Sequence, residues 1–193
     1  MIIGVLALQG AFIEHINMFE SIGVKASEVR LPGQLERISG LVIPGGESTT
    51  IMKLMHSYGL IGPVRKLAAR NAPIWGTCAG MICLAKDAFN PDRTPMETLG
   101  LMDMTVTRNA FGRQVDSFET QLQITALKGG PFPAVFIRAP LIESVGGSVQ
   151  VLARLPAGEI VAAVQGKLLV TSFHPELTGD ARLHSYFAGM AGN

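Results

Sequence analysis

The chain has 193 residues, of which 48% are hydrophobic and 16% charged, and its formal net charge is +1. This length suits a single domain with a sizeable buried core, which we expect to span residues 1–193. The balanced charge argues against an electrostatic nucleic-acid binder. No apolar run is long enough to cross a bilayer, and two cysteines without a signal peptide do not make a disulfide scaffold. The composition therefore predicts a cytoplasmic protein that binds neither nucleic acid nor membrane.

The N-terminal half alternates apolar runs with segments of helical periodicity. A strand buried on both faces is expected over residues 2–8, and further strands are expected over residues 25–30, 40–43 and 73–75. Helices are expected over residues 10–22, 47–58, 60–70 and 79–86. Such alternation predicts a parallel sheet with helices on both faces.

The C-terminal half changes to strand-like segments joined by short turns, followed by a last helix over residues 183–190. The strands are expected over residues 103–107, 117–125, 134–138, 149–154, 160–165 and 168–173. The predicted fold is therefore an α/β three-layer sandwich, with a mostly parallel central sheet and antiparallel additions.

The run Gly76-Thr77-Cys78-Ala79-Gly80 lies between an apolar strand and a helical segment. It matches the nucleophile-elbow pattern, with cysteine at the centre and glycines where side chains would crowd a strained turn. The thiol would lie at a helix N-terminus, which favours thiolate, and the Ala79 N–H could donate to an oxyanion. The alternative is a buried cysteine in a glycine-rich turn, and for Cys83 a packing role is expected.

The run Ser172-Phe173-His174-Pro175-Glu176 follows another apolar strand. Pro175 disfavours helical geometry at His174, so the chain is expected to be extended, with His174 and Glu176 on the same side. A carboxylate beside an imidazole fixes its tautomer and stabilises imidazolium, which in turn favours a thiolate. The alternatives are a solvated strand end, or a metal site for which no third ligand is evident.

The run Pro44-Gly45-Gly46-Glu47-Ser48-Thr49 follows the third expected strand and opens a helix. Its glycines would let backbone N–H groups approach a ligand, so the turn can supply a second oxyanion donor. A tight turn with Ser48 or Thr49 as the helix N-cap is compatible with that role. A phosphate loop is disfavoured because Gly-x-x-x-x-Gly-Lys is absent.

Two segments near expected turns, residues 108–114 and 136–140, carry arginines. From the residues alone, such an arginine more often forms a surface ion pair than a ligand contact. In a cleft, its fork of donors would suit a substrate carboxylate.

These motifs follow one another over nearly the whole chain, starting from Leu8-Gln9-Gly10-Ala11 and Glu14-His15. The elbow and the His-Pro-Glu segment resemble class I glutamine amidotransferases, which implies their flavodoxin-like fold. Residues 108–119 and 136–140 narrow the resemblance to the glutaminase subunits of pyridoxal 5'-phosphate synthase.

The resemblance implies a role for each matching position. Cys78 would be the nucleophile, His174 the base and Glu176 its orienting carboxylate. Gly46 and Ala79 would give the oxyanion N–H groups. Contacts with L-glutamine are implied for Gly46, Glu47, Ser48, Arg108, Ile137 and Arg138. Gln9 would lie near the oxyanion turn and the partner, and neither a cofactor nor a metal is implied.

The implied reaction hydrolyses L-glutamine to L-glutamate and ammonia through a thioester. Ammonia released to water would be protonated and lose its nucleophilicity, so a separate synthase must receive it directly. The resemblance implies a (β/α)8-barrel synthase subunit that makes pyridoxal 5'-phosphate (vitamin B6) within a large ring complex. It also implies weak glutaminase activity until that partner docks.

Three other functions fit parts of the pattern. The chain could serve another synthase, such as one for histidine or purine. It could be a cysteine peptidase or hydrolase on the same elbow, or a binding module without catalysis. The native partner, peptide or ester turnover, and the cellular effect of Cys78→Ala would separate these functions.

Overall fold

The computed structural model describes residues 1–109 and 117–192. Residues 110–116, which include Arg113 of the predicted arginine segment, lie outside the described residues, as does Asn193. The elements of the N-terminal half alternate as predicted. The strands are β1 (Ile3–Leu6), β2 (Ala26–Val29), β3 (Gly40–Ile43) and β4 (Ile74–Thr77). The helices are α1 (Phe12–Ser21), the 3-10 helix η1 (Pro32–Arg37), α2 (Ser48–Ser57), α3 (Ile61–Ala69) and α4 (Ala79–Leu84).

The C-terminal half is mostly strands, as expected from its sequence. The first of them are β5 (Ala85–Phe89), β6 (Pro95–Met96), β7 (Met102–Thr107), β8 (Ser117–Leu122) and β9 (Phe132–Ile137). They are followed by β10 (Leu141–Val145), β11 (Gln150–Arg154), β12 (Ile160–Gln165) and β13 (Leu168–Thr171). A 3-10 helix, η2 (Pro175–Leu177), and helix α5 (Arg182–Gly192) follow.

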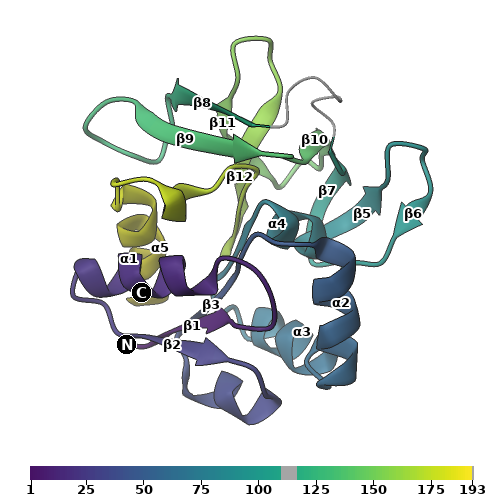
Figure 1. Ribbon diagram of the computed structural model, residues 1–193, viewed down its shortest axis with the longest axis vertical. Coiled ribbons are helices and arrows are strands. Elements are labelled where there is room, and N and C mark those ends of the chain that lie inside the picture. Colours follow the sequence, from purple (N-terminus) through teal and green to yellow (C-terminus); the bar gives the residue numbers. More distant parts are fainter. Residues whose placement is uncertain (110–116, 193) are drawn as a thin grey trace.

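The described strands form an 11-stranded sheet and a separate two-stranded sheet of β8 and β9 (Figure 1). The run β2-β1-β3-β4-β13 is parallel, and β12 and β10 continue it in antiparallel fashion. Ile43 of β3 pairs with Gly76 of β4, and Thr77 pairs with Thr171 of β13. The turns that leave these three strands therefore emerge side by side at one edge, where parallel α/β sheets bind ligands.

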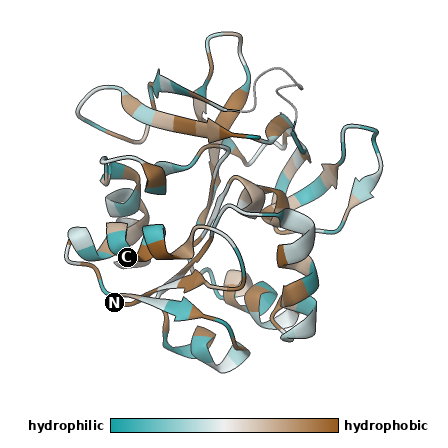
Figure 2. Cartoon of the chain, in the orientation of Figure 1, coloured by the Kyte–Doolittle hydropathy of each residue, from teal (hydrophilic) through white to brown (hydrophobic). Residues whose placement is uncertain are grey.

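Alternate residues of the central strands enter two different hydrophobic layers. Leu41 and Ile43 of β3 pack with α2, α3 and α4, whereas Val42 packs with α1 and α5 on the opposite face. Figure 1 shows α2 and α3 on one side of β1 and β3, with α1 and α5 on the other. Figure 2 shows the hydrophobic residues concentrated along these strands. The predicted α/β three-layer sandwich, mostly parallel at its centre with antiparallel additions, is confirmed.

Five elements were not predicted: η1, β5, β6, β10 and η2. The helix expected over residues 79–86 ends at Leu84, and β5 begins at Ala85, where it pairs in parallel with β7. Strand β5 carries polar Lys86 and Asp87 at exposed positions and has no hydrophobic run of its own. Its conformation comes from pairing with distant β7, a non-local contact that local periodicity does not report.

The elbow requires glycine because α4 crosses close to β3. A Cβ atom on Gly80 would lie 1.9 Å from the carbonyl oxygen of Ile43, and one on Gly76 would lie 2.4 Å from that of Gly80. Glycines were expected here because side chains would crowd the central residue. The crowding is instead between neighbouring backbone segments.

We predict that Gly80→Ala lowers the free energy of unfolding by roughly 2 kcal/mol or more, because neither backbone segment can yield without moving a strand. Gly189→Ala is the matched control: Gly189 is an exposed position of α5, where an added Cβ meets nothing within 4 Å. That change should raise stability by about 0.5 kcal/mol. Denaturant unfolding monitored by circular dichroism measures both. Equal midpoints for the two variants would contradict the packing described.

Candidate active site

Cys78 connects β4 to α4 in a backbone conformation that side chains rarely adopt, with φ 48° and ψ −106°. Its N–H donates to the Thr171 carbonyl at 2.8 Å, and its carbonyl accepts from the Met81 N–H at 3.1 Å. Such strained residues cost about 1–3 kcal/mol and persist only where the surroundings fix them. The strand-to-helix turn expected around Cys78 is present.

His174 and Glu176 form a hydrogen-bonded pair in the segment that follows β13. The Nδ1 atom of His174 lies 2.7 Å from Oε1 of Glu176, and both residues are buried. The expected extended chain was wrong in one respect: Pro175 begins η2, so Glu176 lies in a 3-10 turn and not in a strand. A proline readily begins a helical turn because its fixed φ suits the first position. The pair still meets, since a tight turn also brings residues i and i+2 together.

The His174 imidazole and the Cys78 side chain both lie against Gly45, while Sγ of Cys78 lies 3.8 Å from the Ile137 carbonyl oxygen. A Cβ atom on Gly45 would lie 2.3 Å from Cε1 of His174 and 3.3 Å from Cβ of Cys78, so only glycine leaves room for both. Burial disfavours the imidazolium, but hydrogen bonds with Cys78 and with Glu176 outweigh it and raise the pKa of His174. The charged imidazole is therefore the favoured form at neutral pH, beside the thiol.

The turn after β3 is held by residues that precede α1. The Gly45 carbonyl accepts a hydrogen bond from the Ala11 N–H at 3.2 Å. In a trans peptide the N–H points opposite to the carbonyl, so the Gly46 N–H points away from Ala11. The next N–H, that of Glu47, donates to Oε1 of Gln9 at 2.7 Å. Gln9 thus lies against the turn, where it was expected.

The N-cap of α2 is Glu47, not Ser48 or Thr49 as expected. Its carboxylate accepts from the N–H groups of Thr49 at 3.2 Å and Thr50 at 2.7 Å, so a longer side chain reaches the donors that serine usually caps. Oε1 also lies 3.1 Å from Nη2 of Arg108. Partial burial raises the pKa of the Glu47 carboxyl, but the Thr50 hydroxyl, these N–H groups and Arg108 bring it below its ordinary value.

A cavity of about 320 Å³ opens above Cys78, a size suited to a small ligand. Its lining includes the predicted residues Gln9, Gly46, Glu47, Ser48, Cys78, Ala79, Arg108, Ile137, Arg138 and His174. Sequence reasoning missed three lining residues, Ile82, Asn109 and Pro140. Asn109 and Pro140 adjoin the predicted arginines and could have been included with them. Ile82 lies on the interior of α4 and carried no signal.

Backbone strain is concentrated around this cavity. Five non-glycine residues of the described chain have positive φ, and Cys78, Asn109 and Arg138 among them line the cavity. Ser48 contributes a buried hydroxyl that has no hydrogen-bond partner among the described residues. Strain and unpaired polar atoms are typical of a site shaped for a ligand.

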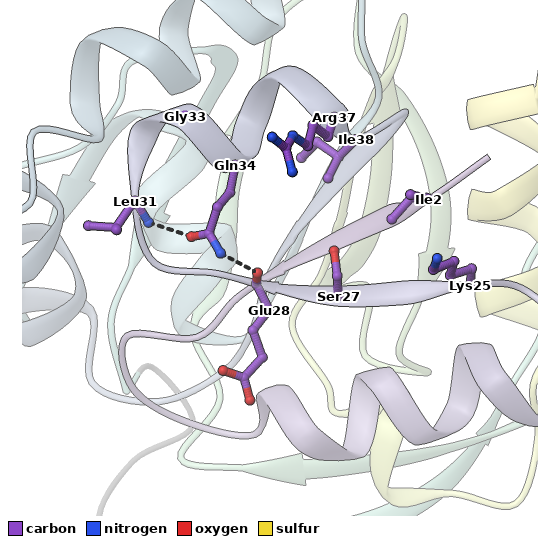
Figure 3. Close-up of a pocket in the computed structure, with 9 residues that line it drawn as sticks. All are labelled: Ile2, Lys25, Ser27, Glu28, Leu31, Gly33, Gln34, Arg37 and Ile38. Atoms are coloured by element: carbon purple, nitrogen blue, oxygen red, sulfur yellow. Dashed lines mark hydrogen bonds between the residues drawn. The ribbon is translucent and has the colours of Figure 1, made fainter.

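A larger hollow, of about 590 Å³, lies elsewhere, beside edge strand β2 and η1 (Figure 3). Gln34 crosses it, accepting from the Leu31 N–H at 2.8 Å and donating to the Glu28 carbonyl at 3.3 Å. It contains none of the predicted site residues. Size alone therefore does not locate the chemistry, and the smaller cavity at Cys78 is the candidate site.

Two features of the described residues concern metal binding and membrane insertion. They contain no group of three or more His, Cys, Asp or Glu residues placed to hold a metal ion. None of their helices is long and apolar enough to span a membrane.

Comparison with known proteins identifies the class. A solved structure titled as a glutamine amidotransferase superposes with a TM-score of 0.92 at 48% identity, covering 99% of both chains. The model of the SNO glutamine amidotransferase family matches residues 5–192. The chain therefore belongs to the SNO glutamine amidotransferase family.

Two curated relatives are more specific. Both are named pyridoxal 5'-phosphate synthase subunit PdxT. The one from Dehalococcoides mccartyi is 61% identical over 99% of this chain and 97% of its own length. The one from Herpetosiphon aurantiacus is 60% identical over 98% of this chain and 100% of its own length.

We predict that iodoacetamide at pH 8 alkylates Cys78 at least about tenfold faster than Cys83, because the thiolate is the reactive form. Cys83 is fully buried, and burial, with the charge of Glu47, raises its pKa to about 12. Peptide mass spectrometry after timed quenching measures both rates. In denaturant, the two thiols should react alike, and preferential labelling of Cys83 in the folded chain would contradict the site described.

Proposed function

We propose that this chain hydrolyses L-glutamine to L-glutamate and ammonia through Cys78, His174 and Glu176. The observation that carries the proposal is a strained cysteine that lines the same small cavity as a carboxylate-paired imidazole. Membership of a glutamine amidotransferase family supports the substrate. It also weighs against a peptidase and against a binding module without catalysis.

The reaction would proceed through a thioester. The Cys78 thiolate attacks the side-chain amide carbon, and the Gly46 and Ala79 N–H groups donate to the oxyanion that forms. The imidazolium of His174 gives its proton to the amide nitrogen, and ammonia leaves as the C–N bond breaks. His174 then takes a proton from water, whose oxygen attacks the thioester carbon and releases glutamate and the thiol. Each oxyanion donor is typically worth roughly 10²–10³ in rate.

The residues at the rim of the cavity carry charges opposite to those of the α-carboxylate and α-ammonium groups of an amino acid. Arg108 and Arg138 carry guanidinium groups suited to the α-carboxylate of glutamine. Glu47 presents a carboxylate suited to the α-ammonium group, and its contact with Arg108 fixes both side chains at the rim. Ser48 and Ile137 complete the walls.

The partner we propose is the (β/α)8-barrel subunit of pyridoxal 5'-phosphate synthase, assembled with this chain into a large ring complex that works in the cytoplasm. The names of the relatives support the synthase. Both cysteines are free thiols, in keeping with a reducing compartment. Direct transfer is chemically necessary because ammonia in water becomes unreactive ammonium.

We predict that Cys78→Ala lowers glutamate formation in the complex with the barrel synthase by at least about 10³-fold, since no other group can form the thioester. Cys83→Ala is the matched control and should keep activity close to that of the unchanged chain. Glutamate is measured from glutamine with and without the synthase, which should stimulate the unchanged chain. Turnover that survives in Cys78→Ala would refute the mechanism.

We predict that Glu176→Gln moves the alkaline limb of the kcat/KM profile to lower pH by at least about one unit. The carboxylate favours the imidazolium and so raises the pKa of His174. Its removal lowers that pKa, so the proton needed by the leaving ammonia is lost at lower pH. Profiles of the complex from pH 6 to 10 test this, and an unshifted limb would show that Glu176 does not set the protonation of His174.

A further inference from the structure

Three buried polar side chains lie near the Glu176 carboxylate. They are in the hydrophobic layer between the central sheet and helices α1 and α5. They are His15 of α1, Thr77 of β4 and His184 of α5, and all three are fully buried. The His15 ring stands edge-on to Trp75, with centroids 5.5 Å apart. Polar groups in such surroundings destabilise a fold unless they are paired, so their mutual contacts call for an explanation.

The three side chains form a chain of contacts that ends on the Glu176 carboxylate. Nε2 of His184 lies 2.9 Å from Nδ1 of His15. Nε2 of His15 lies 3.3 Å from Oγ1 of Thr77, with hydrogen-bond geometry, and 3.3 Å from Oε2 of Glu176 as a charge contact. Oε2 is the carboxylate oxygen that His174 leaves free, and it has no aligned hydrogen bond among the described residues.

The contacts fix where the protons lie. A carboxylate only accepts and would repel a lone pair 3.3 Å away, so Nε2 of His15 carries its proton, which it directs to Oγ1 of Thr77 beside Glu176. Nδ1 of His15 is then a lone pair and accepts from Nε2–H of His184. That leaves Nδ1 of His184 as a bare lone pair, in agreement with its lack of a partner among the described residues.

Both histidines are neutral in this arrangement. Burial lowers the pKa of His15, against the opposing pull of Glu176, and burial followed by His15 lowers the pKa of His184 to about 2. The charged groups near His15 are Glu176 and His174 from the η2 side, with Glu14 on its own helix. A neutral donor orients the Glu176 carboxylate without neutralising it, whereas a cation here would compete with His174.

We propose that His15, held by His184, is a positioning residue that keeps Oε1 of Glu176 on Nδ1 of His174. It touches neither the cavity nor the reacting atoms, and it acts through Glu176. Only its kinetic test rests on the proposed glutaminase reaction.

The first test reads the protons directly in the unchanged full-length chain. Long-range ¹H–¹⁵N spectra at pH 7 should show His15 as a neutral ring protonated at Nε2, with His184 the same. A His15 protonated at Nδ1, or present as imidazolium, would overturn the proposal whether or not the chain hydrolyses glutamine.

The second test measures kcat, KM and the pH profile for glutamine in the complex with the barrel synthase. His15→Leu should lower kcat by about 10–100-fold, the range known for groups that orient metal ligands. KM should change by less than about threefold, because the cavity is untouched. His15→Gln places an amide N–H near the Nε2 position and should restore kcat to within about fivefold.

Two further variants separate positioning from stability. Ile3→Ala removes buried side-chain volume from the same layer at β1, away from the site, and should keep kcat within about twofold despite a lower unfolding midpoint. If His15→Leu does not fold, His184→Phe is tested in its place and should also lower kcat.

Normal kcat in a folded His15→Leu, or equal loss in the Leu and Gln variants, would overturn the proposal. Absence of turnover in the unchanged complex would instead refute the proposed function and leave the spectroscopic test standing.

Discussion

The site depends on the close approach of three backbone turns at the carboxyl ends of β3, β4 and β13. Cys78 holds a conformation that is unfavourable in itself, and it persists because the strand before it and the helix after it are fully buried. Gly80 allows α4 to lie against β3, and Gly45 allows an imidazole to reach the thiol. The strain at Cys78 is thus maintained by packing that would exist without any chemistry.

Electrostatics then set the state of these groups. Burial alone would leave His174 neutral, yet hydrogen bonding and charge interaction with the sulfur of Cys78 on one side and the carboxylate of Glu176 on the other reverse that effect. Burial alone would also protonate Glu176, but His15, followed by the hydrogen bond from His174, lowers its pKa. The charge on each group depends on its neighbour, so the pair acts as a unit.

Much of this could be read from the sequence, and the failures have physical causes. The parallel core was predictable because strands buried on both faces read as continuous apolar runs. Cys78, His174 and Glu176 were recognisable because glycine and proline report backbone geometry directly. Strands β5 and β10 were missed because their pairing is non-local and charged or polar residues interrupt their short apolar stretches. The Glu47 cap was missed because Ser48 and Thr49 follow it, and short polar residues are the commoner N-caps.

His15 and His184 are 169 residues apart, and nothing local in either helix reveals that their rings meet.

The segment that enters α1 touches both halves of the site. Gln9 and Ala11 hold the glycine turn, and His15, one helical turn further on, contacts Glu176. Ala11 is the N-cap of the helix that carries His15, so a shift of this segment along the helix axis would move both contacts at once. A mutation that displaces this segment would therefore disturb the glycine turn and the Glu176 contact together, and not one of them alone.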